Sequence, residues 1–190
     1  MTQDTITIVS GLPRSGTSMT MKMLDAGGMI ILTDNLRSAD EDNPKGYYEF
    51  ELVKQLESNK SWLDDARGKA VKIISQLLKS LPKEYTYKII FMRRNMDEIL
   101  ASQRQMLIRR GEPTDNVNDE KMAKIFQMHL MQAEGWLQKQ PNMQVLYIQY
   151  NDVLNNPIVN IKKINQFLGG RLDEVSMANV VDKSLHRQQA

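Results

Sequence analysis

The segment that most constrains this chain is Gly11–Ser18, Gly-Leu-Pro-Arg-Ser-Gly-Thr-Ser, which lies between an apolar run and a helical pattern. The apolar run predicts a buried strand over Thr5–Ser10, and the pattern that follows predicts a helix over Thr17–Ala26. A loop that joins a strand to a helix directs unpaired backbone N–H groups toward the positive end of the helix dipole. Gly11 and Gly16 permit the tight turn that this arrangement needs. We therefore predict an anion site in this segment, which we call the phosphate loop.

Strand patterns and helical patterns alternate along the rest of the chain, which predicts an α/β fold. This order indicates a P-loop-containing, three-layer fold, with a mostly parallel sheet of about five strands flanked by helices on both faces. With 190 residues and no linker-like segment, residues 1–190 are expected to form a single domain. Further strands are predicted at Met29–Leu32, Ala70–Ile74, Thr86–Met92 and Gln144–Gln149. Further helices are predicted from Met96, over Asp119–Lys139, and from Pro157 to the Gly169-Gly170 pair.

The composition excludes several classes of function. Hydrophobic residues make up 41% of the chain and charged residues 25%, as in an ordinary folded, soluble domain. The net charge of +2, from 25 basic and 23 acidic residues, is too balanced for a nucleic-acid surface, so no nucleic-acid partner is expected. The chain has no cysteine, which excludes disulfides and thiolate metal sites. Since neither a signal peptide nor a membrane span is evident, we expect a cytoplasmic protein with no membrane partner.

The phosphate loop departs from the common nucleotide loop, in which a lysine bridges the terminal phosphates and precedes a Ser or Thr. Here Thr17 stands at the lysine position, and the cation is Arg14 inside the loop. Kinases with such loops also need an acidic residue near the end of a neighbouring strand to hold a metal. The strand over Thr86–Met92 is followed instead by Arg93 and Arg94, which predicts a second anion pocket and no metal site. An ATP-dependent small-molecule kinase stays open as an alternative, with Asp152 as its strand-end carboxylate.

Four segments, covering nearly the whole chain, resemble sulfotransferases that use 3′-phosphoadenosine 5′-phosphosulfate (PAPS). Leu12–Ser18 is similar to the 5′-phosphosulfate loop in its arginine-containing form, as in bacterial members and protein-tyrosine sulfotransferases. Arg94–Ser102 is similar to the 3′-phosphate signature, in which an arginine ends a strand and a serine follows eight residues later. Val145–Asp152 resembles the family's Tyr-Glu-Asp segment, and Val181–Arg187 resembles the tail of bacterial members.

This resemblance implies an enzyme that moves a sulfuryl group from PAPS to a hydroxyl or amine and releases 3′,5′-diphosphoadenosine (PAP), with no metal required. Because side chains alternate along a strand, Arg93 and Arg94 cannot share one pocket, and the family spacing selects Arg94. Tyr150 is expected near the adenine. The implied cofactor-binding residues are Arg14, Ser15, Gly16, Thr17, Ser18, Arg94, Ser102, Tyr150 and Arg187.

The acceptor and the assembly are left open by the sequence. A small molecule, a carbohydrate or a peptide could each supply the hydroxyl or amine, and a homo-oligomer is not excluded. Many family members place an aromatic residue directly after the loop hydroxyls, whereas this chain has Met19. In those members the aromatic ring stacks on the adenine. Because this chain lacks that ring and is short for the family, a catalytically silent nucleotide-binding module is a second alternative.

Sulfuryl transfer needs a base for the acceptor proton and donors for the charge that builds on the leaving phosphate. Arg14 and the loop amides supply the donors, so Arg14 is also a catalytic candidate. Cytosolic members of the family that the chain resembles use a histidine as this base, and other members use a glutamate. Glu49 in Asn43–Glu49 is the first candidate here, with Glu51 and Asp40 as alternatives. A solvated carboxylate near a helix start is an equally good interpretation of Glu49. The two histidines, His129 and His186, lie outside the acceptor-side segment and are not favoured.

Overall fold

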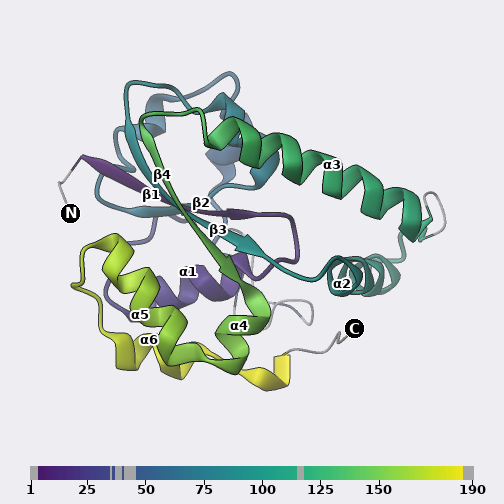
Figure 1. Cartoon of the computed structure of the whole chain (residues 1–190). Helices are drawn as coiled ribbons and strands as arrows, with labels where there is room; N and C mark the ends of the chain where they lie inside the picture. Colours follow the sequence, from purple (N-terminus) through teal and green to yellow (C-terminus); the bar gives the residue numbers. More distant parts are fainter. Residues whose placement is uncertain (1–3, 35, 37–39, 41–45, 115–117, 186–190) are drawn as a thin grey trace.

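The computed structural model describes residues 4–34, 36, 40, 46–114 and 118–185. Within these residues, four parallel strands form one sheet in the order β2-β1-β3-β4 (Figure 1). Because the strands are parallel, their carboxyl ends lie at one edge of the sheet, where ligands bind in open α/β folds. The strands are β1 (Thr5–Gly11), β2 (Ala70–Lys72), β3 (Thr86–Arg93) and β4 (Met143–Gln149).

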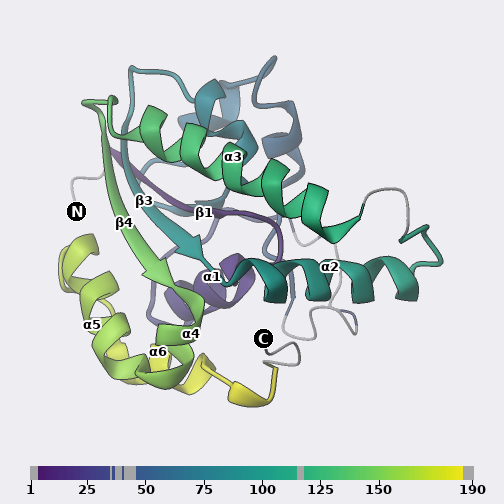
Figure 2. The ribbon, with the colours of Figure 1, turned by 45° about the vertical axis from the view of Figure 1, so that its right-hand side comes forward.

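Helices cover both faces of this sheet. One face packs against α1 (Thr17–Ala26), α4 (Tyr150–Asn155), α5 (Pro157–Leu168) and α6 (Glu174–Val180). The other face packs against α3 (Asp119–Leu137) and short 3₁₀ helices, η1 (Glu51–Gln55), η2 (Ser61–Leu63) and η3 (Ser75–Ser80). A further helix, α2 (Met96–Arg109), follows the carboxyl end of β3 and extends beyond the sheet (Figure 2).

The central strand β1 shows why the chain forms a three-layer fold. All seven of its residues are buried. Ile6 and Ile8 belong to the hydrophobic cluster under α3, whereas Val9 belongs to the cluster under α1 and α5. Successive side chains of a strand point to opposite faces, so an apolar strand of this kind is stable only with cover on both sides.

The predicted α/β class with a parallel, helix-flanked sheet is confirmed, but the sheet has four strands instead of about five. The strand predicted at Met29–Leu32 is wrong. Ile31 makes only an isolated parallel bridge with Ala70, and Ile30 is 64% exposed. The physical reason is that β2, the edge strand beside this segment, has only three residues, so it offers too few partners for a longer ladder.

Most of the predicted helix boundaries are confirmed. The α1 bounds match, α2 begins at Met96, and Pro157 opens α5. Gly169, with a left-handed φ of 106°, caps α5 directly after its last residue, Leu168. The helix predicted to reach Lys139 ends at Leu137. In the part of the chain that the structure describes, no helix combines the length and apolar character needed to cross a membrane.

Candidate active site

The phosphate loop turns tightly between β1 and α1. The φ angles of Gly11, Arg14 and Gly16 are 146°, 69° and 98°, and a positive φ is uncommon for a residue such as arginine. A Cβ atom on Gly11 would lie 2.5 Å from the Ser15 Oγ and 2.6 Å from the carbonyl oxygen of Met92. The Ser15 hydroxyl donates to the Leu12 carbonyl at 2.7 Å and is buried. Ser15 therefore closes the loop from within.

The start of α1 is suited to an anion. Its N-cap residue, Gly16, has no side chain to accept a hydrogen bond from the first turn, and that turn contains no acidic residue. The positive end of the helix dipole is therefore not neutralised by the helix itself. Thr17 and Ser18 occupy the first two helical positions. This matches the arrangement that the sequence predicts for the phosphate loop.

Arg14 and Ser102, predicted for opposite ends of the cofactor, lie side by side. The Arg14 Nε donates a hydrogen bond to the Ser102 Oγ at 2.9 Å. Ser102 lies on α2 and is 88 residues away in the chain, with 7% of its surface exposed. The fold therefore brings the expected 5′-phosphate and 3′-phosphate residues to one edge of the sheet.

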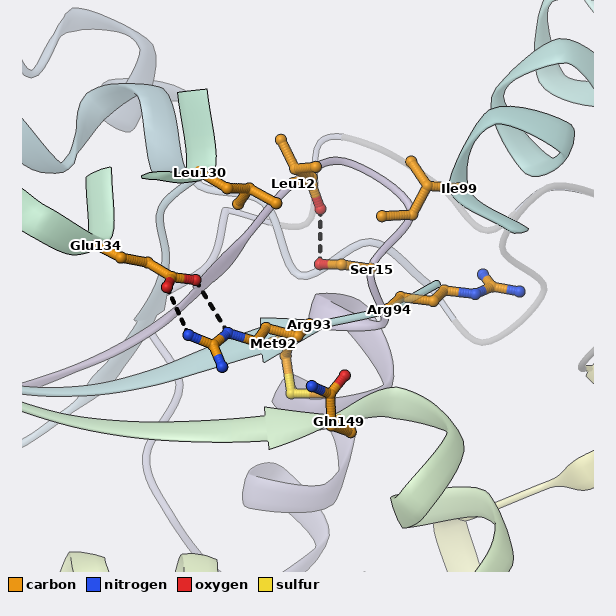
Figure 3. Close-up of a pocket in the computed structure, with 9 residues that line it drawn as sticks. All are labelled: Leu12, Ser15, Met92, Arg93, Arg94, Ile99, Leu130, Glu134 and Gln149. Atoms are coloured by element: carbon orange, nitrogen blue, oxygen red, sulfur yellow. Dashed lines mark hydrogen bonds and ion pairs between the residues drawn. The ribbon is translucent and has the colours of Figure 1, made fainter. Parts of the chain in front are cut away.

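Arg93 and Arg94 point in opposite directions (Figure 3). Arg93 pairs with Glu134 of α3 through two bonds, of 2.9 Å from Nε and 2.5 Å from Nη2, and lies over the Tyr147 ring. Arg94 instead donates from Nη1 to the Arg14 carbonyl at 3.0 Å. The alternation expected for the end of β3 is therefore observed, and Arg94 is the arginine that reaches the phosphate loop.

A cavity of about 160 Å³ lies beside Leu12 and Ser15 of the phosphate loop and the end of β3. Leu12, Ile99 and Leu130 supply apolar walls, and the Arg93–Glu134 ion pair lies across it from Ile99 (Figure 3). The hydrogen bond between Ser15 and Leu12 forms part of the wall toward the loop. Arg94 also lines this cavity.

Tyr150 packs against both the phosphate loop and Arg94. A Cβ atom on Gly16 would come within 2.4 Å of the Tyr150 Cδ2, and the Arg94 guanidinium carbon lies 4.4 Å from the centre of the ring. The tyrosine is 6% exposed, and this burial raises the pKa of its hydroxyl. The Tyr150 ring thus packs against both Gly16 of the loop and the Arg94 guanidinium. Its contact with an adenine stays a prediction.

Lys72 is a site residue that the sequence analysis missed. It ends β2, and its Nζ donates to the Tyr47 carbonyl and lies 3.4 Å from the Ser18 Oγ and 3.5 Å from the Glu49 Oε1. Its side chain is only 9% exposed. The available signal was a lysine in the middle of the apolar run Ala70–Ile74, which the sequence predicts as a strand. Only the pairing of β2 with β1 shows that this lysine lies next to the phosphate loop.

The three candidate base residues have different surroundings. The Glu49 carboxylate lies against Lys72 and is 30% exposed. Glu51 pairs with Lys54 at 2.8 Å at the surface, and Asp40 accepts hydrogen bonds of 2.6 and 2.7 Å from the Tyr47 hydroxyl. Of the three, Glu49 is therefore the candidate that Lys72 connects to Ser18 of the phosphate loop.

The Glu49 segment also carries backbone strain. Tyr48 has a φ of 52°, which costs free energy for a non-glycine residue, and its hydroxyl donates to Asp25 at 3.2 Å. Burial raises the Tyr48 pKa to about 12, with the Asp25 charge adding to the effect. Strained residues often cluster at functional sites, which agrees with a role for this segment.

The remaining candidates lie away from these contacts or outside the described residues. The His129 Nε2 lies 2.8 Å from the Ser75 Oγ, and partial burial, together with the charge of Lys79, lowers the histidine pKa. Asp152, considered for a metal, is exposed in the first turn of α4. Arg187 and His186 lie outside the described residues.

Comparison with known proteins identifies the family. The model of the sulfotransferase domain family matches residues 4–188. The fold is similar to that of mouse sulfotransferase SULT7A1, crystallised with PAP, with a TM-score of 0.62 and 18% identity over 100% of this chain and 69% of that one. It is also similar to the sulfotransferase domain from the curacin biosynthetic pathway, with a TM-score of 0.51 and 14% identity over 97% of this chain and 91% of that one.

Retinol dehydratase, crystallised with retinol and PAP, shares the fold with a TM-score of 0.51 and 16% identity over 95% of this chain and 64% of that one. At these identities the structural likeness establishes the fold. The match to the family model covers nearly the whole chain and confirms the resemblance to PAPS-dependent sulfotransferases that the phosphate loop and the Arg94 segment predicted. The chain therefore belongs to the sulfotransferase domain family.

Proposed function

We propose that this chain transfers a sulfuryl group from PAPS to a hydroxyl or amine of an acceptor. The observation that carries the proposal is the junction of Arg14, Arg94 and Ser102 at the carboxyl edge of the sheet. A donor with phosphate groups at both its 5′ and 3′ ends needs two adjoining anion sites, and this junction joins the residues expected in each. Arginine is suited to both because its planar fork binds phosphate oxygens in pairs.

The residues present fit such a donor. The uncapped start of α1 and Arg14 would hold the 5′ end, and Arg94 with Ser102 would hold the 3′-phosphate. Bound PAPS supplies a sulfuryl group that is already joined to a phosphate leaving group. The loop amides and Arg14 would stabilise the negative charge on that phosphate from positions that the fold has already set.

Glu49 is the proposed general base. Its carboxylate takes the proton from the acceptor hydroxyl or amine, which makes the acceptor atom a better nucleophile. Lys72 links this carboxylate to Ser18 of the phosphate loop and holds the Tyr47 carbonyl at the same point. We expect the Lys72 ammonium to orient Glu49 and, from its place beside Ser18, to stabilise charge on the transferring group.

Among the acceptor classes left open by the sequence, we favour a small molecule. Retinol dehydratase, which shares the fold, was crystallised with retinol. Carbohydrate and peptide acceptors are the classes to compare with it. A cytoplasmic location stays a prediction.

The first test is thermal unfolding of the purified protein with PAP, with adenosine 5′-phosphate, and with ATP plus magnesium. A ligand at a hundred times its dissociation constant stabilises a protein by about 2.7 kcal/mol, or roughly 5–10 °C for a chain of this size. We expect the largest rise with PAP and no need for magnesium. A rise only with ATP and magnesium would replace the proposal with the kinase alternative.

Turnover separates the enzyme from a silent module. Release of PAP from PAPS is measured with panels of phenols, alcohols, amines, sugars and peptides. We expect acceptor-dependent release with at least one panel. Tight PAP binding without release in any panel would instead support a nucleotide-binding module.

A further inference from the structure

Glu98 is a buried carboxylate that the proposed reaction does not use. It lies in the first turn of α2 and is only 3% exposed. Its Oε2 accepts a hydrogen bond from the Arg94 Nε at 2.7 Å, and its Oε1 accepts one from the Asn151 Nδ2 at 2.8 Å. The carboxylate therefore joins the end of β3 to α2 and to α4. A buried charge is costly unless it is paired, and the ion pair with Arg94 offsets that cost for both side chains.

The surroundings of Arg94 show what Glu98 achieves. The guanidinium is held at Nε by Glu98 and at Nη1 by the Arg14 carbonyl, and its plane lies over the Tyr150 ring. An arginine side chain has many rotamers, and fixing them on binding lowers the affinity for a ligand. Here the orientation is set by the protein before any ligand arrives.

Simple electrostatics argues against placing a carboxylate at this position. A negative charge 2.7 Å from the arginine expected to hold a phosphate opposes the binding of that phosphate. A carboxylate at this position is therefore better explained by geometry than by charge. The Glu134 pair with Arg93 is a natural comparison, because it has the same chemistry on the other side of β3.

We propose that Glu98 is a positioning residue that presets the Arg94 guanidinium for the 3′-phosphate of the cofactor. This inference rests on the proposed function, since it assigns the 3′-phosphate to Arg94. Glu98 touches neither the cofactor nor the acceptor and acts through Arg94. Its effect is therefore confined to ligands that carry a 3′-phosphate, and PAP becomes the ligand that distinguishes it from adenosine 5′-phosphate.

The test measures dissociation constants of PAP and adenosine 5′-phosphate by calorimetry for the wild type, Glu98→Ala, Glu98→Gln and Glu134→Ala. With Glu98→Ala, we expect PAP binding to weaken about tenfold because Arg94 must be ordered by the ligand, and adenosine 5′-phosphate to change by less than about threefold. Glu98→Gln should restore most of the loss, since its amide oxygen can accept from Arg94. Its amide nitrogen can donate to the Asn151 Oδ1 once the Asn151 amide turns by 180°, and that oxygen has no hydrogen-bond partner among the described residues. Glu134→Ala should leave the ratio of the two constants unchanged.

Other outcomes would overturn the inference. Tighter PAP binding in both Glu98 variants would mean that charge outweighs positioning. Lower unfolding temperatures with an unchanged ratio of the two constants would mean that Glu98 has a structural role only. If Glu98→Ala does not fold, Asn151→Ala decides: it removes one anchor of the carboxylate and should weaken PAP binding about threefold, and an unchanged ratio would contradict the proposal. Failure of the wild type to bind PAP would count against the proposed function itself.

Discussion

Gly16 provides the sharpest test of how the phosphate loop is held. It has a φ of 98°, and a Cβ atom added there would lie 2.4 Å from the Tyr150 Cδ2, far inside ordinary contact distance. Gly28 has a similar φ of 90°, but a Cβ atom there meets nothing within 4 Å. Alanine at either position incurs the backbone cost, whereas only Gly16→Ala also collides with a buried ring. The difference between the two variants therefore isolates the contact with Tyr150.

The magnitudes follow from these two terms. A left-handed backbone costs about 1–2 kcal/mol for alanine, so Gly28→Ala should lose about that much stability. Gly16→Ala should lose about 1–3 kcal/mol more, because Tyr150 is 6% exposed and overpacking of buried sites costs that amount. Each kcal/mol lowers the unfolding temperature by about 2–4 °C in a chain of this size.

The assay is thermal unfolding by circular dichroism, followed by titration with PAP and adenosine 5′-phosphate. The collision distorts the phosphate loop, which is expected to bind the 5′-phosphate of both ligands, and displaces Tyr150 under Arg94. Gly16→Ala should therefore weaken both ligands, and PAP the more, whereas Gly28→Ala should bind them like the wild type. Equal losses of stability in the two variants would refute the reasoning. Unchanged ligand affinity in Gly16→Ala would show that the loop tolerates the shift.

Three further outcomes are expected. Arg94→Ala should weaken PAP by about tenfold or more and adenosine 5′-phosphate much less, since a charge-assisted bond to the 3′-phosphate is lost; equal losses for both ligands, or the same effect in Arg93→Ala, would contradict the assignment. Glu49→Gln should lower kcat about a hundredfold or more with PAP affinity nearly unchanged, whereas Glu51→Gln should have wild-type turnover; normal turnover in Glu49→Gln would exclude it as the base. Because burial lowers the His129 pKa below its usual 6.5, the folded state favours the neutral ring, and this contribution to stability is present above pH 6.5 and is lost as the pH falls through the lowered pKa. Unfolding temperatures between pH 7.5 and 5 should therefore fall more steeply in the wild type than in His129→Gln, and parallel curves would count against this.

Local features could be predicted from the sequence because their conformation is determined by a few neighbouring residues. The phosphate loop combines a strand, two glycines and a helix start in one short segment, so backbone sterics and the helix dipole determine its conformation. The same holds for the start of α5 at Pro157 and its end at Gly169. The Arg94–Ser102 spacing was also informative, because both residues belong to one strand-to-helix unit and their relative positions are set locally.

Long-range placement was decided by the tertiary structure. Lys72 lies 54 residues from Ser18 in the chain and reaches it only because β2 pairs with β1. In the sequence, Glu98 is an acidic residue at a helix start, where it interacts favourably with the helix dipole. Its hydrogen bond from Asn151 forms only because the fold brings the start of α4 next to α2. The segment Met29–Leu32 has the apolar pattern of a strand but lacks a long neighbour to pair with. Sequence patterns record local conformational preference, whereas hydrogen bonds and ion pairs between distant residues depend on which surfaces the fold brings together.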